Sequence, residues 1–117
     1  QVTATEGDPA LAADTTKILA GLGGPGNVTI RPAPAADGDP ANAPYDVIVL
    51  NGATGIVPER LYGQLKEGGR LVGVFATTQP PRATLVTRSH DDFGNRTLFD
   101  AAVPVLPGLE RLAAFVF

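Results

Sequence analysis

The sequence predicts an α/β fold, a partial Rossmann-like sheet that is mostly parallel with an antiparallel carboxyl-terminal end. First, the apolar run Val47–Leu50 lacks polar alternation, which is typical of a strand covered on both faces in a parallel sheet. Second, a helical segment and another apolar run, Arg70–Ala76, follow it and complete a strand, helix, strand unit. Third, the apolar runs after Ala76 have no intervening helix, which favours antiparallel pairing.

The first elements predicted along the chain are a strand, a helix and a strand. Val2–Glu6 is a short strand that ends in an acidic residue. Asp8 is a suitable N-cap and Pro9 suits the first helical turn, where its missing N–H costs nothing. Apolar residues at helical spacing mark one face of this helix: Leu11, Ile18 and Leu22. The glycine cluster Gly21–Gly26 ends the helix, and Asn27–Arg31 is the next strand.

The middle of the chain is predicted to contain a long loop and a second helix. The segment Pro32–Pro44 is rich in Pro, Ala, Asp and Gly, so we expect a flexible surface loop without regular structure. Pro58 suits the start of a helix that runs to about Lys66. Its apolar residues recur at helical spacing: Leu61, Tyr62 and Leu65. Glu67–Gly69 then ends the helix, with glycine in the left-handed conformation.

The last third of the chain is predicted to consist of strands and connections. The loop Thr77–Arg82 carries two prolines. Three strands are expected after it: Ala83–Arg88, Arg96–Val103 and Leu112–Phe117. A turn at His90–Asn95 separates the first two, and a bend at Pro104–Gly108 joins the last two. A hairpin-like connection of this kind would make the last two strands antiparallel.

Composition limits the classes of function. The chain of 117 residues is expected to form one domain, residues 1–117, and 44% apolar content supplies a core. A net charge of −3 lacks the basic field that nucleic-acid binding requires. Without cysteine there is no disulfide, thiolate metal site or cysteine nucleophile. The apolar runs are too short to span a bilayer, so we expect a cytoplasmic protein that does not bind membranes.

Two positions at predicted strand ends are candidates for ligand binding. Glu6 lies where nucleotide-binding sheets place an acid that accepts hydrogen bonds from ribose hydroxyls, although a helix dipole also favours an exposed acid there. Asn51 and Gly52 follow the Val47–Leu50 strand, at the edge where ligands of parallel sheets gather. Asn51 could bind a substrate amide or carboxylate, or it could cap the loop. His90, the only histidine, lies in a solvated turn without convergent partners, so no metal site is predicted.

Several motifs occur in a characteristic order in the first part of the chain. They are Glu6, Pro9, Asn27-Val28, the APYD of Ala43–Asp46, the P-E-x-L of Pro58–Leu61 and the QLK-x-GGRLV of Gln64–Val72. This series resembles the protein-L-isoaspartate O-methyltransferases, which depend on S-adenosylmethionine. The resemblance implies transfer of a methyl group to an isoaspartyl carboxylate during repair of damaged proteins. It covers at least Val2–Val72.

The resemblance also implies a cofactor site. Glu6 would accept hydrogen bonds from the cofactor ribose, and Asn51, Gly52 and Ala53 would lie beside the transferred methyl group, where small residues allow close approach. Pro34 stands where the family has an aspartate that contacts adenine. Proline has neither a carboxylate nor an N–H, so Asp37 or Asp39 would have to make that contact; otherwise both are ordinary solvated turn residues.

No catalytic residue is assigned, because the reaction does not require one. A carboxylate, with an ordinary pKa of about 4, is already ionised at neutral pH and needs no general base. Catalysis would depend on holding the carboxylate and the methyl group in line.

The resemblance implies that part of the methyltransferase sheet is not in this sequence. The family's first strand and glycine-rich loop would lie between the strands that match Val2–Glu6 and Asp46–Leu50. We therefore expect a carboxyl-terminal fragment that is inactive alone and that can form homo-oligomers through an unfilled sheet edge. Two alternatives remain open. A degenerate relative could use the fold only for protein association, as Pro34 suggests, or the chain could be another nucleotide-binding domain, such as a nicotinamide enzyme.

Overall fold

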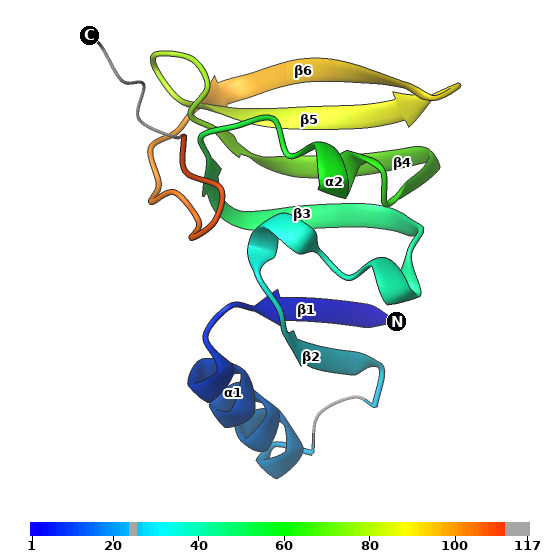
Figure 1. The fold of residues 1–117 in the computed structure, drawn as a ribbon, viewed down its shortest axis with the longest axis vertical. Helices are drawn as coiled ribbons and strands as arrows, with labels where there is room; N and C mark the ends of the chain where they lie inside the picture. The colour runs from blue at the N-terminus through cyan, green and yellow to red at the C-terminus, as the bar shows by residue number, and fades with distance from the viewer. Residues whose placement is uncertain (24–25, 112–117) are drawn as a thin grey trace, which may run out of the picture.

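The protein forms two sheets that do not share a strand (Figure 1). The computed structural model describes residues 1–23 and 26–111. Its main elements are β1 (Val2–Glu6), α1 (Pro9–Gly21), β2 (Val28–Pro32), β3 (Tyr45–Thr54), α2 (Glu59–Tyr62), β4 (Leu65–Phe75), β5 (Arg82–Ser89) and β6 (Asp92–Asp100). Strands β1 and β2 pair in parallel, and the second sheet has the order β3-β4-β5-β6. Only β3 and β4 are parallel in the second sheet, so the predicted mixed α/β fold with an antiparallel end is confirmed.

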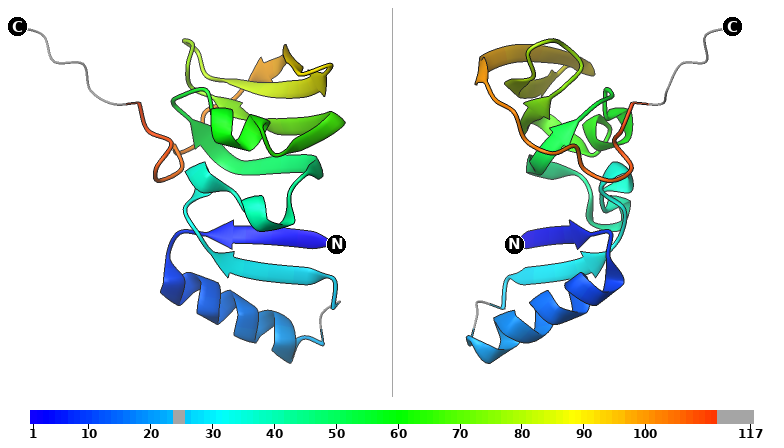
Figure 2. Two further views of the ribbon diagram at one scale, coloured as in Figure 1. Left: turned by 45° about the vertical axis from the view of Figure 1, so that its right-hand side comes forward. Right: turned by 90° about the vertical axis from the view of Figure 1, so that its left-hand side faces the viewer.

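The β1–α1–β2 unit follows the sequence closely at its start. The Asp8 carboxylate accepts hydrogen bonds from the N–H groups of Ala10 and Leu11, at 2.9 and 3.4 Å, and Pro9 begins the helix as predicted. The predicted apolar face is not buried, however. Ala12 is buried, whereas three larger side chains on the helix are exposed: Leu11, Ile18 and Leu22. The helix packs on β1 and β2, and two strands are too narrow to cover its whole apolar surface (Figure 2).

The core lies on one face of the four-stranded sheet. Its buried members come from β3, α2, β4, β5 and the segment after β6: Leu50, Leu61, Tyr62, Leu65, Leu71, Phe75, Val86 and Leu109. On the other face of β3, Val47 and Val49 are 59% and 65% exposed. The prediction that Val47–Leu50 is covered on both faces is therefore wrong for this face.

The second helix is shorter than predicted. Helix α2 ends at Tyr62, and Leu65 already pairs with Tyr45 as part of β4. One helical turn followed by a strand buries Leu61, Tyr62 and Leu65. The spacing of these apolar residues alone does not distinguish this arrangement from a longer helix. Gly68 adopts the predicted left-handed conformation, with φ of 76°, but it lies within the irregular start of β4.

The carboxyl-terminal strands form a tighter hairpin than predicted. His90 and Asp91 have φ values of 52° and 63°, so the turn between β5 and β6 spans these two residues and Asn95 belongs to β6. Strand β5 confirms the prediction for Ala83–Arg88. The predicted strand Leu112–Phe117 lies outside the described residues.

None of the helices in residues 1–23 and 26–111 has the length and apolar content needed to cross a bilayer.

Candidate functional site

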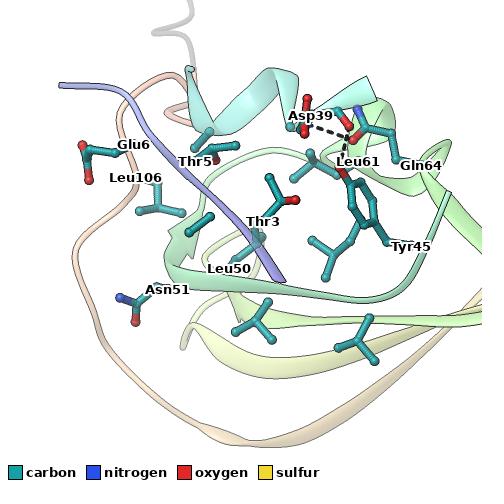
Figure 3. Close-up of a pocket in the computed structure, with 16 residues that line it drawn as sticks. Thr3, Thr5, Glu6, Asp39, Tyr45, Leu50, Asn51, Leu61, Gln64 and Leu106 are labelled. Atoms are coloured by element: carbon teal, nitrogen blue, oxygen red, sulfur yellow. Dashed lines mark hydrogen bonds between the residues drawn. The ribbon is translucent and has the colours of Figure 1, made fainter. Parts of the chain in front are cut away.

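A groove of about 280 Å³ separates the two sheets and lies between β1 and β3. Figure 1 shows that β1 and β3 run in the same direction along its two sides. The lining residues come from both strands, the linker between β2 and β3, helix α2 and the segment after β6. They include Thr3, Thr5, Glu6, Asp39, Tyr45, Ile48, Leu50, Asn51, Gln64 and Leu106 (Figure 3).

The edges of β1 and β3 that border the groove direct backbone N–H and C=O groups into it. On β1, the Val2 N–H donates to Asn27 and the Glu6 carbonyl accepts from Ala33, both on the β2 side. Because successive residues of a parallel ladder direct their backbone groups to opposite sides, Thr3 and Thr5 direct theirs into the groove. On β3, the Tyr45 N–H donates to Gln64 on the β4 side, so the same alternation turns the backbone groups of Ile48 toward β1.

Glu6 is the last residue of β1, whereas Asn51 lies inside β3, which continues to Thr54. The prediction that Asn51 and Gly52 follow the strand is therefore wrong. One carboxylate oxygen of Glu6, Oε1, accepts a hydrogen bond from the Asp8 N–H at 3.0 Å, which leaves Oε2 for other partners. Asn51 is exposed and also lines the groove. The fold thus brings together two of the four residues proposed for the cofactor site.

The other two proposed residues, Gly52 and Ala53, are covered by the segment Pro104–Leu109, which we call the strap. The Ala53 N–H donates to Pro104 at 2.9 Å, and the Leu106 N–H donates to Ala53 at 2.8 Å. Ala53 is fully buried. A Cβ atom at Gly52 would lie 2.8 Å from Leu106 side-chain atoms, so glycine is required there by the strap. The sequence analysis expected only a bend at Pro104–Gly108 and did not assign Leu106 to the site.

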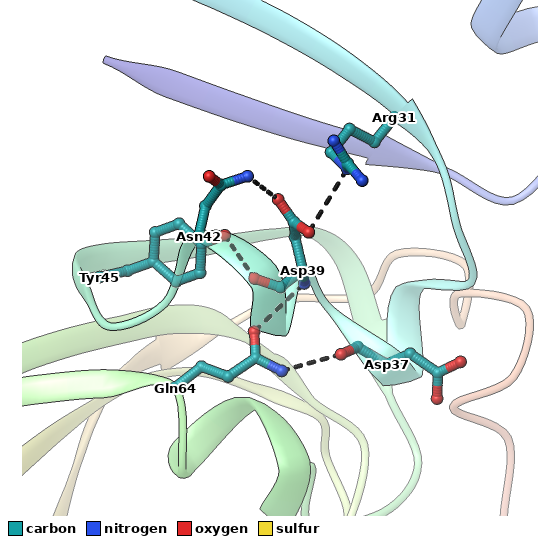
Figure 4. Close-up of polar contacts among 6 residues, drawn as sticks. All are labelled: Arg31, Asp37, Asp39, Asn42, Tyr45 and Gln64. Atoms are coloured by element: carbon teal, nitrogen blue, oxygen red, sulfur yellow. Dashed lines mark hydrogen bonds and ion pairs between the residues drawn. The ribbon is translucent and has the colours of Figure 1, made fainter.

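The linker between β2 and β3 is ordered by two short 3-10 helices, Ala35–Asp37 and Pro40–Asn42. The prediction that Pro32–Pro44 has no regular structure is therefore wrong. Gln64 holds the linker: its Oε1 accepts from the Asp39 N–H at 3.2 Å, and its Nε2 donates to the Asp37 carbonyl at 2.8 Å (Figure 4).

Asp39 is buried, with 7% of its surface exposed, so the expectation of a solvated turn residue is wrong for it. Its carboxylate pairs with Arg31 at 3.4 Å and accepts a hydrogen bond from the Asn42 amide at 2.7 Å. The Tyr45 hydroxyl donates to the Asp39 carbonyl at 2.6 Å. Because these partners come from β2, the linker and β3, the network ties the two sheets together on one side of the groove. Asp37 instead points outward and pairs with Arg60.

Both tyrosines have raised pKa values in the folded protein. Burial raises the pKa of Tyr45 above its ordinary value, and the nearby Asp39 carboxylate raises it further, while Arg31 lowers it. Burial alone raises the pKa of Tyr62. The chain has two tyrosines and no tryptophan, so ultraviolet absorbance near the phenolate band reports on these groups alone.

We expect alkaline pH to destabilise the fold through these phenols. A pKa raised by folding contributes stability that is present below the unfolded value, about 10, and is lost as the pH rises through the folded value. Spectrophotometric titration is expected to give midpoints above 10 for the native chain and near 10 in denaturant. Tyr45→Phe is the matched control that leaves Tyr62 alone. Native midpoints at 10 would contradict the raised pKa of both phenols.

His90 lies at the exposed hairpin turn, where its N–H donates to Glu67 at 2.7 Å. Among residues 1–23 and 26–111, no group of three or more potential metal ligands comes together.

Comparisons with known proteins agree on one family. The sequence model described as protein-L-isoaspartate(D-aspartate) O-methyltransferase matches residues 1–100. A protein-L-isoaspartate O-methyltransferase 1 of Rhodopseudomonas palustris strain HaA2 is 39% identical over 97% of this chain and 47% of its own length. Another from strain ATCC BAA-98 / CGA009 is 40% identical over 93% of this chain and 50% of its own length. The chain thus spans about half the length of these relatives.

Solved structures share the fold. One protein-L-isoaspartate O-methyltransferase superimposes with a TM-score of 0.83 at 23% identity, covering 92% of this chain and 35% of that protein. A Plasmodium falciparum protein described as a member of the same group, in complex with S-adenosyl-L-homocysteine, gives a TM-score of 0.75 at 17% identity, covering 89% of this chain and 51% of that protein. At this identity, the likeness concerns the fold.

Proposed function

This chain belongs to the protein-L-isoaspartate(D-aspartate) O-methyltransferase family, and we propose that it is the carboxyl-terminal part of an S-adenosylmethionine-dependent enzyme that methylates isoaspartyl carboxylates in damaged proteins. One observation carries the proposal: Glu6 and Asn51, from strands far apart in the sequence, line the same groove, Glu6 at the end of β1 and Asn51 in the carboxyl-terminal half of β3. Ligands of parallel α/β sheets bind at the carboxyl ends of the strands.

The residues of the groove fit the ribose end of the cofactor. Glu6 keeps one carboxylate oxygen free of the hydrogen bond to Asp8, and a carboxylate can accept from both ribose hydroxyls. The Asn51 amide offers a donor and an acceptor on the opposite side of the groove. Bound S-adenosylmethionine would supply an electrophilic methyl group. Glu6 and Asn51 would orient it, and the strap would exclude water from Gly52 and Ala53.

The adenine end fits less well. Pro34 starts the first 3-10 helix of the linker, and the Asp39 carboxylate is already engaged by Arg31 and Asn42. Pro34 has no side-chain acceptor, and burial of Asp39 limits access of an adenine amino group to its carboxylate. Asp37 pairs with Arg60. This observation favours a second candidate function, in which the domain keeps the fold for protein association without methyl transfer. The nicotinamide alternative loses its support, because the family match accounts for the acid at the end of β1.

We also propose that a strand fills the groove. The backbone groups of Thr3, Thr5 and Ile48 face it from two parallel strands, and unpaired strand edges recruit further strands. A parallel strand would join the two sheets into one and give the cofactor residues their final spacing. A second copy of the chain is the competing occupant, and it would produce concentration-dependent oligomers.

The proposal is tested by isothermal titration of the full natural polypeptide that contains this sequence with S-adenosylmethionine and S-adenosylhomocysteine. We expect saturable binding of both and methyl incorporation into an isoaspartyl peptide, with no incorporation into the aspartyl control peptide. No binding of either ligand would remove the methyltransferase proposal. Binding without methyl incorporation would favour the association function.

A further inference from the structure

Asn51 and Gly52 form a chemically reactive pair of neighbours at the groove. The side-chain amide of an asparagine reacts with the backbone nitrogen of the residue that follows it, and a five-membered cyclic imide results. Glycine hinders this reaction least, because no Cβ atom shields its nitrogen and its backbone rotates most freely. The sequence contains one other pair in which an acidic or amide side chain of this length precedes glycine, Asp37-Gly38. The structure restrains these two pairs differently.

The Asn51-Gly52 pair lies in an irregular stretch of β3. The register of β3 with β4 shifts between Val49 and Ala53, so residues 50–52 stand outside the regular ladder. Asn51 is exposed, and Figure 3 shows its amide directed away from β3. A regular ladder resists the backbone rotation that brings an asparagine side chain to the next nitrogen. That restraint is weakened at Asn51.

The strap explains why a reactive pair is present at this point of the strand. A Cβ atom at residue 52 would lie 2.8 Å from Leu106 side-chain atoms and 3.2 Å from the Pro104 carbonyl oxygen. Packing of the strap therefore requires glycine at this position. The same lack of a side chain leaves the Gly52 nitrogen open to the Asn51 amide.

The Asp37-Gly38 pair is restrained by its contacts. The Asp37 carboxylate pairs with Arg60 at 2.6 Å, and the Asp37 carbonyl accepts from Gln64 Nε2 at 2.8 Å. The Gly38 N–H donates to the Ala35 carbonyl at 3.3 Å. An ionised carboxylate is also a poorer electrophile than an amide. Both the contacts and the charge slow imide formation at Asp37.

We propose that Asn51 is a site of spontaneous deamidation. A bond forms between the Gly52 nitrogen and Cγ of Asn51, and the bond from Cγ to Nδ2 breaks. Nδ2 leaves as ammonia with the proton that the Gly52 nitrogen releases. One water molecule then opens the cyclic imide at either of its carbonyl groups, which gives an aspartyl or an isoaspartyl residue. This reaction does not depend on the proposed function, because it needs only the chain and water.

Deamidation changes both the charge and the backbone at the groove. The neutral Asn51 amide becomes a carboxylate, which is ionised at neutral pH because its ordinary pKa is about 4. The groove then holds this charge in addition to that of Glu6. The isoaspartyl form also adds a methylene group to the main chain of β3, next to the pairing of Ala53 with the strap.

The test is peptide mapping by mass spectrometry after incubation of the full natural polypeptide in heavy-oxygen water at mildly alkaline pH, with a parallel sample in urea. We expect Asn51 to become aspartyl and isoaspartyl residues that carry solvent oxygen, within about tenfold of the rate in urea, because residues outside a regular ladder open readily. Asp37 is the internal control and should incorporate solvent oxygen much more slowly than Asn51 in the native sample. Asn51→Gln is expected to keep its amide, because glutamine would have to close a larger ring.

Two results would overturn the proposal. One is an Asn51 that stays an amide in the native polypeptide and reacts only in urea, because β3 would then hold the pair as firmly as a regular strand. The other is equal incorporation of solvent oxygen at Asn51 and Asp37 in the native sample. Circular dichroism during the incubation verifies that the native sample remains folded.

Discussion

Replacement of Leu109 by alanine is expected to lower the free energy of unfolding by about 2–5 kcal/mol, the range for removal of a fully buried leucine side chain. Leu109 is 1% exposed and packs in the main core although it lies beyond the last strand. Its carbonyl also accepts a hydrogen bond from the Gly55 N–H at 2.8 Å. Loss of the side chain therefore leaves a cavity and frees the strap from the end of β3.

The measurement is urea denaturation of the wild type and the variant. Their free energies of unfolding are compared on condition that the dependence of this free energy on urea concentration has the same slope in both proteins. Leu98→Ala is the matched control, because Leu98 is 46% exposed on the outer strand and should change the free energy of unfolding by no more than about 0.5 kcal/mol. A Leu109→Ala variant as stable as this control would show that the strap is not seated in the core.

Glu6→Gln is expected to weaken binding of S-adenosylhomocysteine to the full natural polypeptide by about 10- to 100-fold. A hydrogen bond to a charged acceptor contributes about 1.5–3 kcal/mol, and glutamine replaces the carboxylate by a neutral amide with one acceptor oxygen. That oxygen can still accept from the Asp8 N–H, so the start of α1 should be unaffected. The loss is therefore expected in affinity and not in stability.

Isothermal titration gives the affinity, and thermal unfolding verifies the fold. Asp14→Asn, an exposed acid on α1 outside the groove, removes the same charge and serves as the control. If Glu6→Gln and Asp14→Asn bind the ligand equally well, Glu6 does not hold the ribose, and the carboxyl end of β1 is not the cofactor site.

Local chemistry explains what could be predicted from the sequence. Asp8 and Pro9 define the start of α1 by capping and by a fixed φ, and neither depends on the rest of the fold. The ends of β1 likewise follow from short-range signals, whereas β2 begins and ends one residue later than the predicted strand Asn27–Arg31. The predicted length of α2 is wrong because Leu65 has the spacing of a helical residue but pairs with Tyr45 as part of β4. The spacing of apolar residues gives no information about such a long-range pairing.

Tertiary contacts explain the rest. Asp39 is typical of a solvated turn in sequence, but it is buried by Arg31 on one side and by Gln64, 25 residues away, on the other. The resemblance implies close approach of the cofactor at Gly52, and the group that comes close to Gly52 in the structure is Leu106 of the strap. A glycine in the sequence indicates that another group approaches the backbone closely, but it does not identify that group.

The central claim is that the groove between β1 and β3 is an empty strand position of a methyltransferase sheet. Amide hydrogen exchange tests it most directly, in the chain alone and after addition of the part of the Rhodopseudomonas palustris HaA2 relative that precedes the matched residues. We expect the Thr3, Thr5 and Ile48 amides to exchange fast in the chain alone and at least about tenfold more slowly in the mixture, because they acquire strand partners. The Ala4 and Val49 amides, directed toward β2 and β4, should be protected in both samples. Slow exchange of Thr3, Thr5 and Ile48 in a monomeric chain alone would contradict the claim.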